Sequence, residues 1–203
     1  MSNIRAYAVN ENYFDVIDSE EKAYILGLLY SDGWVTGGPT YRVGFSSTDI
    51  ELPQMLCACL DCSYPIKPHK KKEEHHSQGY EVSFGSKHMA GVLHFLGRTP
   101  LKSEAKYPVI PITLNRHFIR GVFDGDGSVS LTSRGYVRYT LVAPLKVLST
   151  VVALIGGVIH KHGTTFRIER KGTNVSKNFY EYLYRDATLY LKRKEEIMRK
   201  SLR

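Results

Sequence analysis

The sequence contains no long apolar run and only a few cysteines. No apolar segment approaches the roughly 18 residues that a membrane-spanning helix requires, and the amino terminus, Met-Ser-Asn-Ile-Arg, lacks the apolar region of a secretory signal. The three cysteines all lie between Cys57 and Cys62, which fits a reducing compartment better than a disulfide framework. We therefore expect no membrane partner and an intracellular, cytoplasmic protein of prokaryotic or phage type.

Acidic residues are also in deficit. The chain has 28 Lys and Arg against 20 Asp and Glu, which gives a net charge of +8 and a pI near 9.3. Such an excess suits a polyanionic partner, with nucleic acid first and an anionic membrane surface second. A chain of 203 residues can bury one good core or two small fused ones.

Several catalytic patterns are missing. There is no Ser-His-Asp pattern, no phosphate-binding loop and no histidine–asparagine nuclease motif. Cys57-x-Cys59-x-x-Cys62, with His69, His75 and His76 beyond it, is a candidate zinc site. The alternative is that these cysteines are small core residues, because Cys57 and Cys59 follow a helical pattern.

One nine-residue segment occurs twice. Ile25 to Gly33 reads Ile-Leu-Gly-Leu-Leu-Tyr-Ser-Asp-Gly, and Ile119 to Gly127 reads Ile-Arg-Gly-Val-Phe-Asp-Gly-Asp-Gly. The copies are 94 residues apart, measured from the glycines (121 − 27) or from the aspartates (126 − 32). The repeat predicts two copies of one compact unit.

Each copy has the pattern of a helix that ends at its Asp-Gly. Small residues recur every fourth position, a spacing that lets two helix backbones approach closely; they are Ala23, Gly27 and Ser31 in the first copy, and His117, Gly121 and Gly125 follow the same stripe in the second. Gly33 and Gly127 are expected to end the helices in the left-handed conformation.

Paired helices would bring Asp32 and Asp126 side by side at the same end. The two carboxylates would repel each other and lie at the negative ends of both helix dipoles, so a bound cation would stabilise them. Hard oxygen ligands favour Mg²⁺, which Mn²⁺ can replace.

The rest of the pattern repeats in the same order. We expect each half to contain a helix, two strands, a helix, two strands and a closing helix. Asp18 with Glu21, Thr48 or Asp49, and Thr113 are the expected helix caps. The expected elements are helices from Asp18, Thr48 to Leu60, Ser86 to Leu96, from Thr113, Pro144 to Ile155, Ser176 to Tyr184 and Leu191 to Leu202, and strands at 34–36, 41–45, 64–70, 80–84, 128–132, 137–142, 158–162 and 166–170.

From about Glu20 to Arg203, the two motifs and the order of elements resemble the single-chain form of the LAGLIDADG homing endonucleases. The resemblance implies an α+β fold of two pseudo-symmetric αββαββα halves, packed through the motif helices, with two antiparallel sheets forming a DNA-binding saddle. It divides the chain into an arm (1–17), a first half (18–110) and a second half (111–203).

The resemblance also implies the site residues. Asp32 and Asp126 would be catalytic and would hold the metal, with the backbone carbonyls of Ser31 and Gly125 as further ligands. A basic residue per half would come from Lys102 and Lys192, with Lys194 or Lys106 as alternatives. Where some relatives carry glutamine after the second strand, this chain has Ser47 and Ala143. Asp124 is expected to be structural or solvent-exposed.

The open faces of the two sheets would bind the DNA. Mixed basic, hydroxyl and acidic side chains suit the reading of base edges; they are Arg42, Ser46, Lys67, His69, Glu81 and Ser83 in half one, and Ser128, Ser130, Arg138, Thr140, Arg167 and Glu169 in half two. Contacts to phosphates are expected from Lys70–Lys72, Arg170–Lys171, Lys192–Lys194 and Arg199–Lys200.

The resemblance therefore implies a monomeric, Mg²⁺-dependent, site-specific endonuclease that cuts both strands of double-stranded DNA and leaves short 3′ overhangs. Two alternatives remain on the same scaffold: a non-cleaving DNA-binding protein or transcription regulator, and an RNA-splicing maturase.

Overall fold

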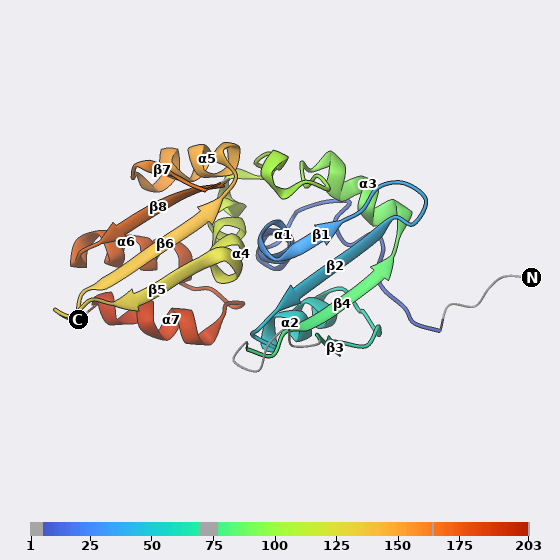
Figure 1. The fold of residues 1–203 in the computed structure, drawn as a ribbon, viewed down its shortest axis with the longest axis horizontal. Helices are drawn as coiled ribbons and strands as arrows, with labels where there is room; N and C mark the ends of the chain where they lie inside the picture. Colours follow the sequence, from blue (N-terminus) through green and yellow to red (C-terminus); the bar gives the residue numbers. More distant parts are fainter. Residues whose placement is uncertain (1–5, 70–76, 164, 203) are drawn as a thin grey trace, which may run out of the picture.

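The two motif segments form two helices that lie side by side in the middle of the molecule, α1 (Glu20–Ser31) and α4 (Asn115–Asp126) (Figure 1). The structure, a computed structural model, describes residues 6–69, 77–163 and 165–202. Two sets of predicted residues lie outside the described ranges: the phosphate contacts at Lys70–Lys72 and the candidate zinc ligands His75 and His76.

Each motif helix is followed by the same series of elements. In half one these are β1 (Gly33–Val35), β2 (Arg42–Ser47), α2 (Glu51–Cys59), β3 (Lys67–Pro68), β4 (Tyr80–Gly85) and α3 (Lys87–Phe95). In half two they are β5 (Gly127–Leu131), β6 (Val137–Ala143), α5 (Leu145–Ile155), β7 (Ile159–His162), β8 (Thr165–Lys171), α6 (Thr173–Tyr184) and α7 (Lys192–Arg199). Short 3₁₀ turns η1 (Lys102–Glu104), η2 (Ile112–Leu114) and η3 (Lys200–Leu202) complete the described chain.

Both sheets are antiparallel and have equivalent strand orders. The first is β1-β2-β4-β3 and the second is β5-β6-β8-β7. Gly33 pairs with Phe45, and Gly127 pairs with Leu141, so the residue after each motif aspartate begins an edge strand in the same register. The predicted α+β fold with two antiparallel sheets is confirmed.

Glycine allows the two central helices to touch. A Cβ atom added to Gly27 would lie 2.9 Å from the Cα of Gly121 and would overlap the carbonyl oxygen of Phe118. A Cβ on Gly121 would in turn lie 2.9 Å from the Cα of Gly27. Both distances are shorter than ordinary carbon contacts, so larger side chains would force the helices apart.

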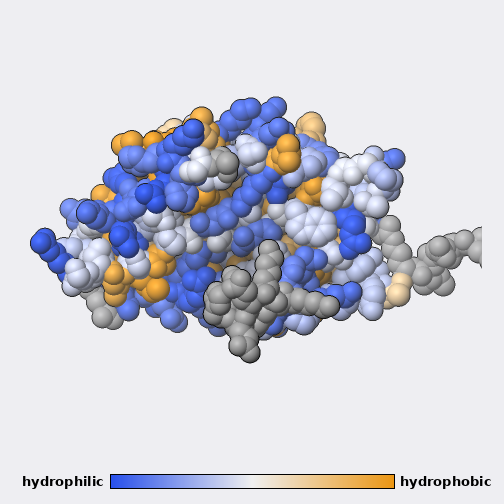
Figure 2. Space-filling view, viewed as in Figure 1, coloured by the Kyte–Doolittle hydropathy of each residue, from blue (hydrophilic) through white to orange (hydrophobic). Residues whose placement is uncertain are grey.

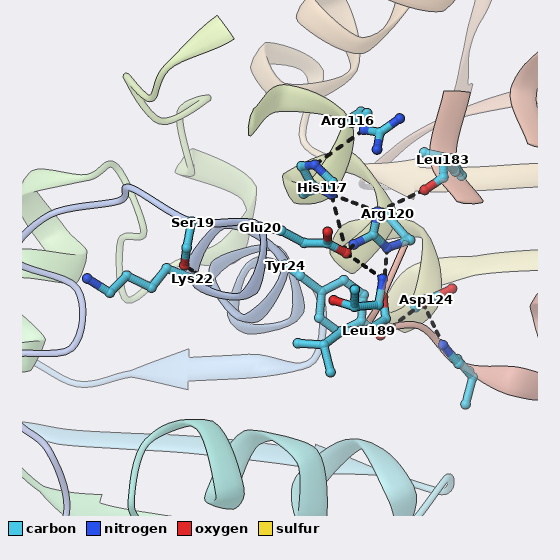
Figure 3. Close-up of polar contacts among 12 residues, drawn as sticks. Ser19, Glu20, Lys22, Tyr24, Arg116, His117, Arg120, Asp124, Leu183 and Leu189 are labelled. Atoms are coloured by element: carbon cyan, nitrogen blue, oxygen red, sulfur yellow. Dashed lines mark hydrogen bonds and ion pairs between the residues drawn. The ribbon is translucent and has the colours of Figure 1, made fainter. Parts of the chain in front are cut away.

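A buried polar network joins the halves at the other end of these helices (Figure 3). Arg120 of α4 is fully buried and donates to Glu20 Oε1 at 2.7 Å and to the carbonyl oxygens of Leu183 and Leu189 at 2.8 Å. His117 Nδ1 lies 2.9 Å from Arg120 Nη1, and burial, together with this cation, lowers the pKa of His117 to about 4. Half one is thereby tied to the chain that precedes α7.

The segment before α1 is more ordered than the predicted arm. Tyr13, Phe14 and Ile17 are buried in the core, and the Asn10 N–H donates to the Leu60 carbonyl at 2.8 Å. These contacts attach the described part of the segment, from residue 6, to half one.

The predicted helix caps are wrong. α1 is capped by Ser19, whose hydroxyl accepts from the Lys22 N–H at 3.2 Å, and the predicted cap Asp18 lies one residue earlier, ion-paired with the Lys22 ammonium at 3.0 Å. Thr113 lies inside η2, and α4 begins after Leu114 without a side-chain cap.

Helix α2 likewise begins without a side-chain cap, after Ile50. Asp49, one of its two predicted caps, is bound to Arg193 of α7 instead, and the other, Thr48, makes no capping bond.

The predicted left-handed ends at Gly33 and Gly127 are also wrong. Neither residue has a positive φ, and Gly127 has φ −78° and ψ 154°. Glycine is needed for space, because a Cβ on Gly33 would lie 2.5 Å from the Leu29 carbonyl oxygen and one on Gly127 would overlap Phe123. The chain passes directly from helix to strand at both places.

Strand β3 is shorter than predicted, since among the described residues of the predicted strand (64–69) Lys67 and Pro68 alone pair with β4. Proline has no N–H to donate to a neighbouring strand, so Pro68 is tolerated because β3 is an edge strand of its sheet. No helix in the described part of the chain has the length and apolarity that a membrane crossing requires.

Candidate active site

The two motif aspartates meet at the paired ends of α1 and α4. Asp32 is the C-cap of α1 and Asp126 is the last residue of α4. Ser31 of α1 fills the space that a side chain on Gly125 would need, and Asp32 Oδ2 lies 3.4 Å from where that Cβ would be. The close contact between Gly125 of α4 and Ser31 of α1 therefore holds the two carboxylates near each other.

Burial and mutual repulsion change the acidity of this pair. Desolvation, and then the charge of Asp126, raise the pKa of Asp32 to about 6, although Lys102 and Lys194 oppose the shift. A carboxyl group with a raised pKa between helix ends is stabilised by any cation that binds it.

Lys102 provides one such cation. It comes from η1 in the linker between the halves, and its Nζ lies 2.5 Å from Asp126 Oδ2. The contact is an ion pair between an ammonium that is 41% exposed and a carboxylate that is 17% exposed. The structure thus places Lys102, one of the two basic residues that the resemblance implies, beside Asp126.

Lys192 is not placed there. It is the exposed first residue of α7, and its side chain has no hydrogen bond or ion pair within the described ranges. Lys194, one of the alternatives, is only 1% exposed and points inward, and its Nζ lies 2.5 to 3.2 Å from the carbonyl oxygens of Phe123, Asp124, Gly125 and Gly127.

Arg98 makes the equivalent contact in half one. It is 2% exposed, and it donates to the Leu29 carbonyl at 2.9 Å and to the carbonyls of Gly33 and Thr99. Arg98 is not among the residues predicted from the sequence. The sequence signal for Arg98 is its distance from the motif. Arg98 lies 66 residues after Asp32 (98 − 32), and Lys194 lies at a similar distance, 68 residues after Asp126 (194 − 126).

Asp124 is structural, the first of the two alternatives expected for it, and it is fully buried. It accepts from the Tyr24 hydroxyl at 2.9 Å and from the Tyr184 hydroxyl and the Leu191 N–H at 2.8 Å. Burial raises its pKa. These bonds fix Leu191, the residue before α7, and so place Lys194 against α4.

The open sheet faces gather the predicted polar residues. In half two, Ser128, Ser130, Arg138, Thr140, Arg167 and Glu169 line one hollow of about 320 Å³. In half one the register places Ser46 beside Glu81 and Glu81 beside Lys67, while Arg42 donates to Ser83 at 2.6 Å and His69 lies 3.2 Å from Glu81. Figure 2 shows the hydrophilic character of this face along both sheets.

Trp34 is a further residue of this face that the sequence analysis did not select. It pairs with Gly44, and a Cβ on Gly44 would overlap the indole ring, so the ring lies across the strand. The corresponding residue of half two is Ser128 (34 + 94).

The donor set at the carboxylates suits Mg²⁺. This ion is usually held by one or two carboxylates, with waters and substrate phosphate oxygens as its other ligands. Asp32 and Asp126 supply two carboxylates, and the described residues contain no group of three or more His, Cys, Asp or Glu that could form an all-protein site. The Gly125 carbonyl, a predicted ligand, already accepts from Lys194 at 3.2 Å.

The cysteines do not form a zinc site with described residues. Cys57, Cys59 and Cys62 are free and half-buried, and they belong to no cluster of metal-binding residues in the described ranges. The thiol of Cys57 lowers the pKa of Cys62 to about 7.

Comparison of the sequence finds no matching family model and no matching curated protein. Solved structures match over nearly the whole chain. The homing endonuclease I-WcaI bound to its DNA recognition sequence is 12% identical over 91% of each chain, with a TM-score of 0.63. The I-LtrWI LAGLIDADG homing endonuclease bound to target DNA is 10% identical over 90% of this chain and 89% of that one, with a TM-score of 0.60.

A third match is the N-terminal LAGLIDADG domain of DUF199/WhiA. It is 14% identical over 93% of this chain and 92% of that one, with a TM-score of 0.55. Similarity at these identities establishes a shared architecture, and the resemblance indicated by the two motifs is confirmed at that level. The chain has the LAGLIDADG endonuclease fold.

Proposed function

We propose that the protein is a site-specific, metal-dependent endonuclease of the homing type. It would hydrolyse one phosphodiester bond in each strand of a long double-stranded DNA target and leave short 3′ overhangs. One observation carries the proposal: Asp32 and Asp126 converge at the paired ends of α1 and α4. Holding two repelling carboxylates together costs stability, and a protein that only bound DNA would gain nothing from that cost.

DNA binding by the two sheets supports this function. The open faces carry basic and hydroxyl side chains on both sides of the carboxylates, and the chain has a net charge of +8. Arginine and hydroxyl side chains can read base edges in the major groove. Because both motifs belong to one chain, a monomer would carry one carboxylate for each strand.

Mg²⁺ is the proposed cofactor, and Mn²⁺ is the proposed substitute. Bound at Asp32 and Asp126, the ion would supply charge stabilisation and a more acidic water for attack on the phosphate. Lys102 is close enough to add positive charge beside Asp126. Arg98 and Lys194 hold the helix ends in place, so the carboxylates are positioned before DNA binds.

A plasmid-library digestion tests the proposal. We expect linear product at one site in Mg²⁺ and none in EDTA. Asp32→Asn and Asp126→Asn should each abolish linear product while leaving DNA binding largely intact, because each replaces one carboxylate oxygen with an amide nitrogen and removes one negative charge without changing the size of the side chain. Full cleavage by either variant would exclude that residue as a metal ligand.

A non-cleaving DNA-binding protein is the second candidate. It is favoured by the Lys102–Asp126 ion pair, which already neutralises one carboxylate without a metal. A gel shift without cleavage, in Mg²⁺ and in Mn²⁺, would support this candidate.

A further inference from the structure

The two halves differ beside the active site. In half two a cavity of about 600 Å³ lies between the linker and the carboxyl end of β6, and we name it the lysine cleft. Lys102, Lys106 and Lys146 line it, and Val142, Ala143 and Phe166 add apolar lining. Lys102 also contacts Asp126, so the lysine cleft adjoins that carboxylate.

The lysine cleft is continuous with the open face of the second sheet. Val142 pairs with Arg167, and Arg167 lines the polar hollow on that face. A polymer lying along the sheet toward Asp126 would therefore pass the lysine cleft.

The positive charge of the lysine cleft is only partly compensated. Lys106 and Lys146 are exposed, and neither side chain has a hydrogen bond or an ion pair among the residues that the structure describes. Glu104 is the acidic residue of the lining, against three lysines. A cavity with positive side chains and apolar surface suits a chain of phosphates joined by sugars.

The equivalent position in half one is bridged by an acid–base pair. Phe45 and Leu141 occupy equivalent register positions, so Asp49 corresponds to Leu145 at the lysine cleft (45 + 4 and 141 + 4). Asp49 accepts two hydrogen bonds from Arg193, each of 2.6 Å. This bidentate pair neutralises the arginine and joins α7 to half one.

We propose that the lysine cleft binds the sugar–phosphate backbone of the DNA strand that meets Asp126, and that the equivalent place among the described residues of half one, bridged by Asp49 and Arg193, does not. The phosphates would lie against Lys106 and Lys146, and the deoxyribose rings would lie against the apolar residues. DNA would thus be held asymmetrically by a nearly symmetric fold. The inference rests on the proposed function, because it requires DNA on the open sheet faces.

Salt-dependent DNA binding tests this inference without cleavage. Binding of a fluorescein-labelled duplex of arbitrary sequence would be followed by anisotropy in EDTA, between about 50 and 200 mM salt. Lys106→Gln and Lys146→Gln should each reduce the slope of log affinity against log salt by about 0.9, the value for one lost phosphate contact.

Two matched variants complete the design. Lys177→Gln removes the same charge from the exposed surface of α6, which lies behind the second sheet (Figure 1), and should leave the slope unchanged. Arg193→Gln should also leave it unchanged, because Asp49 already neutralises that guanidinium. Melting temperatures would verify that each variant is folded.

The outcomes distinguish a failure of the proposed lysine cleft from a failure of the proposed function. Unchanged slopes for Lys106→Gln and Lys146→Gln, with normal binding by the unmodified protein, would overturn the lysine cleft and leave the proposed function standing. An equal loss for Arg193→Gln would overturn the asymmetry. If the unmodified protein binds no DNA over this whole range of salt concentrations, the proposed function itself fails.

Discussion

Arg98 and Lys194 occupy equivalent places in the two halves, each with its cationic group buried against backbone carbonyls at the carboxyl end of a motif helix. The carbonyls are related by the repeat: those of Leu29 and Gly33 in half one correspond to those of Phe123 and Gly127 in half two (123 − 29 and 127 − 33). Helix carboxyl ends carry partial negative charge, which a cation stabilises. This compensation allows aspartates to occupy the same ends.

Lys194→Met should therefore destabilise the protein. Burial lowers the pKa of Lys194 to about 8, yet its ammonium donates to four carbonyls around the carboxyl end of α4, and its loss would leave these buried carbonyls with fewer donors. We expect the free energy of unfolding in urea to fall by about 2–3 kcal/mol. Lys192→Met, on the exposed side of the same helix, is the control and should change it little. Equal stability of the two variants would contradict this role for Lys194.

The glycine contact between α1 and α4 gives a second prediction. Gly27→Leu and Gly121→Leu should each lower the free energy of unfolding by about 1–3 kcal/mol or more, because the new side chains would overlap the opposite backbone. Gly91→Leu is the matched control, since a Cβ at this position of α3 meets no atom within 4 Å. If Gly91→Leu lowers the melting temperature as much as Gly27→Leu and Gly121→Leu do, the helices do not touch at these glycines.

The sequence predicted the parts of the site that depend on local repetition. The spacing of four between small residues and the repeated Asp-Gly both lie within single helices, so Gly27, Gly121 and the two aspartates could be selected directly. Which residue of Lys192-Arg193-Lys194 faces inward depends on where α7 begins and on Asp124 holding Leu191, and these contacts join residues 67 apart. No local pattern encodes that information.

The caps failed for two reasons. Asp18 and Ser19 are adjacent and both suit an N-cap by residue type, so the residue types alone do not distinguish them; in the structure Ser19 caps α1 and Asp18 pairs with Lys22. The Asp49–Arg193 pair removes Asp49 from the start of α2, and its two residues are 144 positions apart.

The raised pKa of Asp32 predicts a pH-dependent stability. The pKa is about 6 in the folded protein and about 3.9 in an unfolded chain, so between these values the folded state binds more protons. Stability without metal should consequently fall as pH rises from about 4 to 6. Asp32→Asn should remove this loss and be more stable in EDTA at pH 7.5, by about 1–3 kcal/mol.

Asp186→Asn, at an exposed position, is the matched control for that measurement and should follow the unmodified protein at every pH. The stability difference between Asp32→Asn and the unmodified protein should shrink as the pH falls toward 4. A difference that stays constant would contradict a raised pKa of Asp32.

Trp34 should report DNA binding directly. It is the one tryptophan of the sequence, and it lies on the open face of the first sheet, over Gly44. DNA on that face should change the intensity or the wavelength of its emission, and a titration should saturate at the same concentration as anisotropy. Trp34→Phe should lose the signal and still bind. Saturated binding with unchanged emission would place the DNA elsewhere.

The unequal surroundings of the two aspartates predict unequal cleavage of the two DNA strands. Asp126 has a lysine at 2.5 Å, whereas no hydrogen bond or ion pair of the Asp32 side chain joins it to another described residue; the strand β2 ends with the hydroxyl of Ser47, while β6 ends with the methyl of Ala143. A supercoiled plasmid carrying the target should accumulate nicked circles before linear product.

Lys102→Gln should slow cleavage of one strand at least tenfold more than cleavage of the other, because a positioned acid–base group contributes about 10²–10⁴-fold. The two rates would be measured with separately labelled strands at saturating protein. Lys192→Gln should alter neither rate, because its side chain lies on the exposed surface of α7. Equal effects of the two substitutions, one on each strand, would instead support the symmetric lysine pair that the repeated sequence predicts.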